Sequence, residues 1–460
     1  MKFFKSNFIR NLFFAVITAL FIDFVAFDRI FSTVIHLVLF CYIGFLIIKN
    51  HKKALLVVIG YGILIPTYPR TILDDVDLLM AGDVEYTTFY SLGAGPLNLY
   101  FILLVLLLFK LTYLNKGNIA SLRKQNIYLF LFIITILTSF SYNFFFQTAY
   151  VNFSVNYFSV IKFLLYSFLG FFIFKTFKGS VNINFFFNIA IILGMRVGFF
   201  LIFDALFANI PKLDFALQPY ITMPLLFVVL GNKIKLNALD FIFIVFSLLY
   251  PSRSFILLFL ISALIFGFST KFSRPFVKLV GSLSVVIVLV GVILYTYNER
   301  IFDFFLWKLE VINTVSGNSE MSGSGDIRLL ELKNIFAKIS SSPLSLLLGE
   351  GPFGYYNFDY FPLQIKGTID SKSFPYDQVL SDKYFTVHNF TSFLLLKLGF
   401  IGLFLYFLFA STILFIKNKS SKIHTQLSFL PLLYTYYFNP INALFLGILM
   451  SNKVSYETNK

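Results

Sequence analysis

Long apolar runs constrain this chain more than any other feature of its sequence. A helix needs about 20 apolar residues to cross the hydrocarbon core of a bilayer, and runs of about that length recur from Phe8–Phe27 to Asn389–Ile416. Only 13% of the residues are charged, against about 25% in soluble domains, and the mean hydropathy is +0.82. The sequence therefore predicts an all-α polytopic membrane protein with about 12 to 14 transmembrane helices.

Positive charge is concentrated in the short connections between these runs. Lys2 and Lys5 precede the first run, and Lys52 and Lys53 follow the second. By the positive-inside rule, these connections and both chain ends are expected in the cytoplasm. The long polar segment over residues 298–387 then faces outward as one large loop.

This topology predicts three parts of the chain. Residues 1–297 form the N-terminal transmembrane helices, residues 298–387 form the large loop, and residues 388–460 form the C-terminal transmembrane helices. Within the last part, residues 427–450 fit either one tilted helix or a hairpin of two short helices. Pro440 favours the hairpin, because proline costs roughly 3 kcal/mol in a helix interior.

The net charge of +15 raises the question of a nucleic-acid partner. The distribution of charge argues against one, because the large loop holds eight Lys or Arg and eleven Asp or Glu residues. Cys41 is the only cysteine, and the four histidines lie far apart in the sequence. The sequence therefore predicts neither an intramolecular disulfide nor a metal site.

Most residues suited to chemistry lie in the large loop. Residues 299–313 are expected to form an amphipathic helix at the membrane interface. A second helix is predicted over Ile327–Ile339, whose apolar stripe includes Ile335, Phe336 and Ile339. Arg328 and Glu331, three residues apart, are expected on a face away from that stripe.

A glycine-rich stretch and a histidine follow this helix. Gly349, Gly351 and Gly354 predict a tight turn whose N–H groups can face an anion. Their spacing matches neither a Walker loop nor a dinucleotide fingerprint, so the stretch alone indicates little. His388-Asn389 lies where the next spanning helix begins.

The order of these motifs resembles the O-antigen polymerase and O-antigen ligase superfamily. The resemblance covers mainly residues 250–405. It is carried by Ser252-Arg253, Arg328, Pro343 with Gly349-Glu350-Gly351-Pro352-Phe353-Gly354, and His388-Asn389 followed by Gly399 and Gly402. Glu331 departs from the pattern, because the residue three after the loop arginine is often aromatic in this family.

The resemblance implies a GT-C-like membrane enzyme without a cofactor or a catalytic metal. It implies inverting glycosyl transfer at the periplasmic face of the bacterial inner membrane, with undecaprenyl-diphosphate-linked oligosaccharides as donors. The polymerase joins repeat units to one another, and the ligase moves the glycan to lipid A core. Chain length and phenylalanine bias favour the polymerase by analogy. A chain-length regulator and a flippase are the protein partners that this role implies.

Residue types assign candidate roles within that reaction. Arg253 and Arg328 are candidates for binding the diphosphate, because a guanidinium stays charged and binds phosphate with two donors. Arg196 is a third candidate, since a charge inside a membrane helix often lines a cavity. Gly349 and Gly351 are candidate substrate contacts through their backbone.

The acceptor hydroxyl needs a general base within hydrogen-bond reach. His388 is the first candidate, and Glu350 or Glu331 the second. Asn389 is expected to orient His388 or a sugar hydroxyl.

Structural alternatives stay open for each of these residues. Arg196 could pair with Asp204, Arg253 could anchor the membrane interface, Arg328 could pair with Glu331, and His388 could cap its helix. A transporter or flippase for the same lipid-linked sugars is a rival function, although the chain lacks the paired repeats expected of one.

Overall fold

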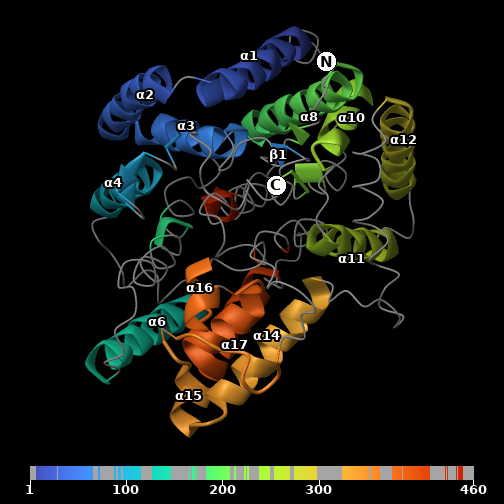
Figure 1. The fold of residues 1–460 in the computed structure, drawn as a ribbon. Coiled ribbons are helices and arrows are strands. Elements are labelled where there is room, and N and C mark those ends of the chain that lie inside the picture. Colours follow the sequence, from blue (N-terminus) through green and yellow to red (C-terminus); the bar gives the residue numbers. More distant parts are fainter. Residues whose placement is uncertain are drawn as a thin grey trace. The chain divides into compact units, whose positions relative to one another are not determined.

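The computed structural model shows a mostly helical chain (Figure 1). The structure describes residues 7–27, 29–65, 71–72, 88–89, 92–94, 97–114, 127–146, 165, 168–170, 172, 183–207, 212–213, 222–223, 225–226, 238–248, 253–269, 274–297, 324–351, 354–362, 376–385, 387–414, 430, 433, 442 and 444–448. The chain forms two compact units. Unit 1 comprises Met1–Leu114, Phe172–Glu310 and Lys417–Lys460, and unit 2 comprises Asn115–Phe171 and Val311–Ile416. The predicted partition at residues 297 and 387 refers to the membrane and stays a prediction.

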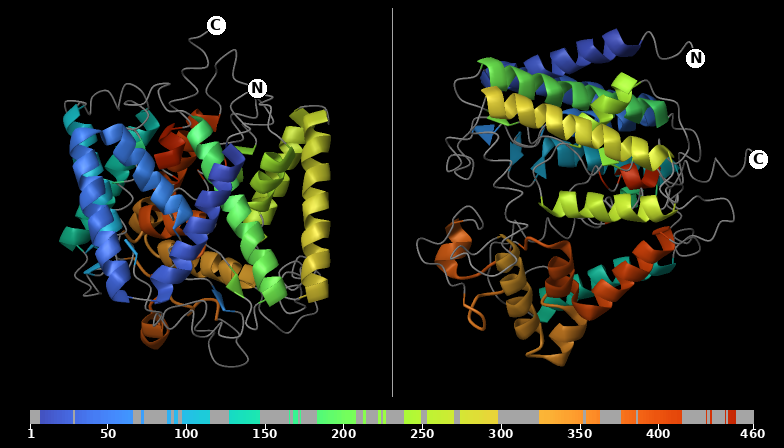
Figure 2. Two further views of the ribbon diagram at one scale, coloured as in Figure 1. Left: turned by 90° about the horizontal axis from the view of Figure 1, so that it is seen from above. Right: turned by 90° about the vertical axis from the view of Figure 1, so that its right-hand side faces the viewer.

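Helices make up most of the described part of unit 1 (Figure 2). They are α1 (Asn7–Phe27), α2 (Arg29–Lys49), α3 (His51–Leu64), α4 (Leu99–Leu114), α8 (Ile183–Phe207), α10 (Ala238–Phe246), α11 (Arg253–Ser269) and α12 (Arg274–Tyr297). Helix α8 packs against α1, α10 and α12. At the α8–α10 contact, a Cβ added to Gly194 would lie 1.7 Å from the Phe243 carbonyl oxygen. Glycine at this position lets the two helix backbones touch.

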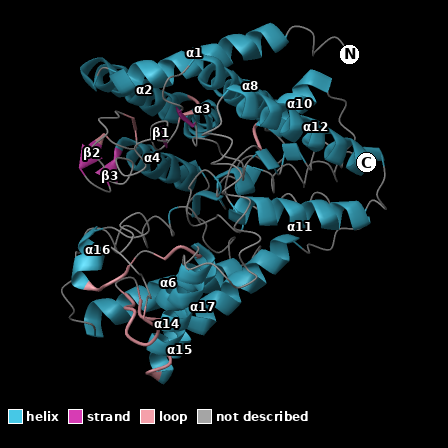
Figure 3. Ribbon diagram, turned by 45° about the vertical axis from the view of Figure 1, so that its right-hand side comes forward, coloured by secondary structure: helices cyan, strands magenta, loops and turns pink. Residues whose placement is uncertain are grey.

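Two short antiparallel strand pairs also lie in unit 1 (Figure 3). Strand β1 (Thr71–Ile72) pairs with β4 (Lys212–Leu213), and β2 (Gly93–Ala94) pairs with β3 (Leu97–Asn98).

Unit 2 is built around one helix, α17 (Phe390–Leu414), which packs against the other helices of the unit. These are α6 (Ile127–Phe146), α14 (Ser324–Ile339) and α15 (Pro343–Leu348), and the unit also contains α16 (Tyr376–Ser381). One hydrophobic core joins α14, α17 and the segments before α17. Its buried residues are Ile327, Ile335, Ile339, Tyr356, Phe358, Tyr384, Val387, Leu395 and Leu396. This core brings the predicted loop helix against the start of α17.

Helix α14 confirms the predicted loop helix, but the predicted face was partly wrong. Ile335 and Ile339 are buried as expected, whereas Phe336 is 50% exposed. Glu331 was expected on a face away from the apolar stripe. It is instead fully buried, on the same side of the helix as Ile335 and one turn before it. A carboxylate tolerates such burial where hydrogen-bond donors meet it.

Two helices of the described chain are long and apolar enough to cross a membrane, namely Ile30–Lys49 and Phe390–Thr412. Shorter apolar helices lie at Ile9–Leu20, Leu99–Leu114, Phe130–Ser139, Phe185–Phe199 and Leu258–Phe268. All coincide with apolar runs of the sequence and support a membrane protein. The predicted helix at 299–313 and the predicted helix or hairpin at 427–450 lie wholly or largely outside the described residues. The count of 12 to 14 spans and the outer loop stay predictions.

Two glycines allow the end of α15 to touch α17. Gly349 ends α15 with φ +75°, and Gly399 interrupts α17 with φ +61° and ψ −163°. A Cβ added to Gly399 would lie 2.5 Å from the Gly349 nitrogen and 2.5 Å from the Leu347 carbonyl oxygen. Both the backbone angles and the close approach therefore require glycine.

We expect Gly399→Ala to lower the free energy of unfolding by about 3 kcal/mol, because it adds left-handed strain and displaces backbone. Gly44→Ala in α2 is the matched control, since nothing lies within 4 Å of its added Cβ. It should leave stability unchanged or slightly raised. Thermal unfolding of the detergent-solubilised protein measures both variants, and equal melting temperatures would contradict the packing role of Gly399.

Candidate functional site

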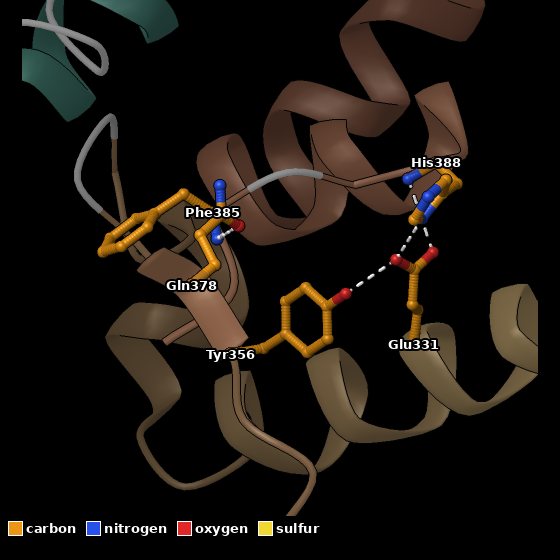
Figure 4. Close-up of polar contacts among 5 residues, drawn as sticks. All are labelled: Glu331, Tyr356, Gln378, Phe385 and His388. Atoms are coloured by element: carbon orange, nitrogen blue, oxygen red, sulfur yellow. Dashed lines mark hydrogen bonds and ion pairs between the residues drawn. The ribbon is translucent and has the colours of Figure 1, made fainter. Parts of the chain in front are cut away.

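Glu331 and His388 form an acid–base pair in unit 2, although 57 residues separate them (Figure 4). Oε1 of Glu331 lies 2.6 Å from Nδ1 of His388. Oε2 of Glu331 accepts a longer bond, 3.4 Å, from the backbone N–H of His388. The Glu331 side chain is fully buried, whereas the His388 side chain is 27% exposed. The pair therefore couples a carboxylate shielded from water to an imidazole that an outside molecule can reach.

Tyr356 is the third member of this group. Its hydroxyl donates to Oε1 of Glu331 at 2.6 Å, and its ring is fully buried. Backbone hydrogen bonds in both directions, 2.9 and 3.1 Å long, pair Tyr356 with Tyr384. Burial and the negative charge of Glu331 raise the pKa of the Tyr356 hydroxyl far above its ordinary value. The hydroxyl therefore stays neutral and keeps its proton for Glu331.

Asn389 forms the N-terminal cap of α17. Its side-chain oxygen accepts a 3.0 Å hydrogen bond from the Thr391 backbone N–H, and its carbonyl accepts one of 2.9 Å from the Phe393 N–H. The cap fixes the chain direction just after His388. Asn389 was expected to orient His388 or a sugar, and the cap is the contact that the structure gives it.

We expect Asn389→Ala to cost about 1 kcal/mol of stability, because it removes the cap, while Asn389→Asp keeps an oxygen in place and costs less. Comparing the thermal unfolding of the two variants checks this difference. If aspartate destabilises the protein as much as alanine does, the capping role of Asn389 is wrong.

The glycine-rich stretch is tied to the helices around it. The Gly349 N–H donates to the Ser345 carbonyl at 2.8 Å, and the Glu350 N–H donates to the Leu396 carbonyl at 2.7 Å. These amides thus have partners within unit 2, and the approach to α17 explains glycine at position 349. Anion binding by Gly349 and by Gly351, whose φ is +74°, stays a prediction.

The side chain of Glu350 acts on a lysine. Burial lowers the pKa of the Lys338 ammonium, and the Glu350 carboxylate opposes that shift. Of the two glutamates weighed as alternative bases, it is Glu331 that the structure brings to His388.

Lys397 fastens the glycine turn to α17. The side chain is 4% exposed, and its Nζ donates to the Gly354 carbonyl at 2.5 Å. From α6, the Ser139 hydroxyl donates to the backbone carbonyl of Lys397 at 3.1 Å. These hydrogen bonds hold the glycine turn and α6 against α17.

The three candidate arginines have different surroundings. Arg196 lies fully buried in α8 of unit 1, where it donates to the carbonyl of Leu64, the last residue of α3. Cations interact favourably with the carbonyl end of a helix, and a substrate-binding role for Arg196 stays a prediction. Arg253 is the first residue of α11, also in unit 1. Arg328 is half-buried on α14, three residues before Glu331.

Unit 2 brings together two of the predicted residues, Glu331 on α14 and His388 just before α17. Asn389 follows His388 in the chain, and Arg328 lies three residues before Glu331 on the same helix. The candidate base and a buried carboxyl group therefore meet where α14 contacts the start of α17.

Sequence reasoning missed Tyr356 and Asn334. The side chain of Asn334 exchanges two 2.9 Å hydrogen bonds with the backbone of Phe361, which fixes the segment after Tyr356. Asn334 and Glu331 are polar residues three apart that share a buried face with Ile335. Two polar residues at helical spacing within an apolar stripe were the available indication. Nothing in the sequence separates Tyr356 from its neighbour Tyr355.

Residues 238–407 match the family model described as O-antigen ligase. The match includes α14, the glycine stretch, His388 and most of α17. It supports the O-antigen polymerase and ligase superfamily as a whole, whose members are membrane-associated, glycosyltransferase-like enzymes with lipid-linked glycan substrates. Neither the curated proteins nor the solved structures contain a match.

Proposed function

We propose that this protein is a polymerase of O-antigen or a similar surface polysaccharide. It joins undecaprenyl-diphosphate-linked oligosaccharide repeat units at the periplasmic face of the bacterial inner membrane, as a multi-pass membrane glycosyltransferase. The observation that carries this proposal is the Glu331–His388 pair, which lies within the region that matches the superfamily.

The reaction is a single displacement at the anomeric carbon of the donor sugar. The acceptor hydroxyl oxygen attacks that carbon from the face opposite the diphosphate, so the configuration inverts. The new glycosidic bond forms as the bond from carbon to diphosphate oxygen breaks. The hydroxyl proton passes to His388, and undecaprenyl diphosphate leaves with the electron pair. Solvent then takes the proton from His388.

Negative charge grows on the diphosphate as it leaves. We assign Arg328, on the same helix as Glu331, to that charge, because a guanidinium neutralises phosphate oxygens without a change of protonation. Arg253 stays a second candidate from the sequence. Fixed cations of this kind stabilise a leaving group without a metal ion. Arg196 stays a third candidate for binding the diphosphate, and its hydrogen bond to the Leu64 carbonyl suits a structural role equally well.

A ligase is the second candidate function, because the matching family model carries that description. The donor and the chemistry are the same in both cases. The acceptor differs, being the growing lipid-linked glycan in a polymerase and lipid A core in a ligase.

A gel of surface polysaccharide from cells lacking this gene separates the candidates. The polymerase predicts lipid A core carrying a single repeat unit without a ladder. Bare core with accumulated lipid-linked polymer would instead assign the ligase. An unchanged ladder would overturn both and favour a transporter or a scaffold. In this pathway a flippase supplies the substrate, and a chain-length regulator is an expected partner.

A further inference from the structure

The Tyr356, Glu331 and His388 side chains form a line joined by hydrogen bonds (Figure 4). Tyr356 and Glu331 are fully buried, and His388 is partly exposed. Both links of the line, from the tyrosine hydroxyl to Oε1 and from Oε1 to Nδ1, measure 2.6 Å. In such an arrangement, the buried tyrosine and glutamate determine the orientation and the protonated nitrogen of the histidine.

We propose that Tyr356 and Glu331 are positioning residues that hold His388 with its proton on Nδ1. This tautomer leaves Nε2 as the basic atom for the acceptor hydroxyl. The inference rests on the proposed function for its meaning, but the tautomer can be measured without any reaction.

Hydrogen-bond donors determine the tautomer. The tyrosine hydroxyl gives its only proton to Oε1, and the His388 backbone N–H reaches Oε2. With a donor at each oxygen, the Glu331 carboxylate acts as an acceptor of hydrogen bonds. The Nδ1 atom, 2.6 Å from Oε1, must then be the donor. In a neutral imidazole the other nitrogen is left unprotonated, and that nitrogen is Nε2.

The contacts of Tyr356 fix its position, so that its hydroxyl can restrain the Glu331 carboxylate. Its backbone is bonded to Tyr384 on one side. Its ring lies edge-on against Phe358, with centroids 5.4 Å apart. Asn334 fixes the backbone of Phe361 a few residues further on. A rigid tyrosine limits where the Glu331 carboxylate can move, and the carboxylate in turn orients the ring of His388.

Contact with Glu331 also stabilises the protonated, positively charged form of His388 that the proposed reaction produces. When Nε2 takes the acceptor proton, the imidazolium faces a carboxylate that is shielded from water. A buried opposite charge stabilises the cation that forms during proton transfer. Tyr356 keeps the carboxylate in place throughout, because it remains a neutral donor.

Nitrogen-15 NMR of histidine-labelled, full-length protein in detergent tests the proposal directly. The chain has four histidines, and His388→Gln identifies the resonances of His388. We expect the wild type to show His388 with Nδ1 protonated. Glu331→Gln should change the ratio of the two tautomers, because an amide can also donate to Nδ1. A wild-type His388 protonated on Nε2, or an unchanged ratio in Glu331→Gln, would overturn the proposal.

Kinetics supply a second readout for Tyr356. We expect Tyr356→Phe to lower kcat by about tenfold with little change in KM, the size of effect seen when an outer partner of a site residue is lost. Tyr384→Phe is the matched control, since it removes a hydroxyl from the same core and leaves the Tyr356–Glu331 bond in place. It should match the wild type. Equal kcat values for the two variants at equal melting temperatures would contradict a positioning role.

The positioning inference and the proposed function fail in different ways. If His388→Ala keeps its activity while the spectra show the expected tautomer, the proposed function is wrong and the geometry stands. If His388→Ala is inactive while the wild-type proton lies on Nε2, the positioning role alone is wrong.

Discussion

Replacing His388 with alanine is expected to lower the rate of polymerisation by about 10² to 10⁴, the range that a general base contributes. His388 is the partly exposed member of the pair with Glu331. Loss of the imidazole leaves the acceptor hydroxyl without a proton acceptor. KM for the lipid-linked repeat should change little, because the loss falls on the transition state. Assays of purified enzyme on a defined lipid-linked repeat measure both constants.

The removal of a histidine can also affect folding, so a control is needed. His51→Ala changes a histidine at the first residue of α3, in unit 1, and we expect nearly wild-type activity. Thermal unfolding of His388→Ala shows whether the variant is still folded, because the buried Glu331 carboxylate loses one hydrogen-bond partner. A stable His388→Ala protein with normal kcat would remove His388 from the mechanism.

Replacing Arg328 with alanine is expected to lower turnover by about 10² to 10³, as removal of a fixed donor for developing negative charge does. Arg328 is half-buried on α14, next to the Glu331 position. Lysine at this position should restore part of the activity, because it keeps the positive charge. Restoration should be incomplete, since an ammonium cannot form the bidentate hydrogen bonds of a guanidinium. Single-turnover rates with the lipid diphosphate donor separate this step from product release.

Lys333→Ala is the matched control for Arg328. It removes a positive charge from an exposed position on the same helix. Activity within about twofold of the wild type is expected, because exposed charges on a helix contribute little. If Arg328→Ala and Lys333→Ala have equal activity, the diphosphate role of Arg328 is wrong.

Much of the helical framework was predictable because length and apolar composition decide which segments form spanning helices. Helix α6 (Ile127–Phe146) and the part of α11 after Arg253 contain no charged residue, so both are recognisable in the sequence as apolar runs. Arg123 and Lys124 precede α6, and Arg253 and Lys271 bound α11, so these ends were also predictable. The break of α17 at Gly399 was not, because it depends on the backbone of α15 approaching from elsewhere in the chain.

The sequence indicated individual residues of the candidate site, but it did not indicate the contacts between them. His388 and Glu331 were both selected, but as alternative bases rather than as partners. Their contact joins positions 57 residues apart, and periodicity placed Glu331 on the wrong face of its helix. Burial of a carboxylate depends on donors that distant segments bring to it. In this chain those segments carry Tyr356 and the start of α17, and no local pattern shows where they meet.

Purified protein in lipid vesicles, supplied with one undecaprenyl-diphosphate-linked repeat unit, tests whether this chain alone polymerises the repeat. We expect a ladder of longer lipid-linked glycans without lipid A core, one undecaprenyl diphosphate released per new bond, and an unchanged rate in the presence of a metal chelator. Transfer that requires lipid A core, or no new glycosidic bond under any of these conditions, would contradict the proposed function.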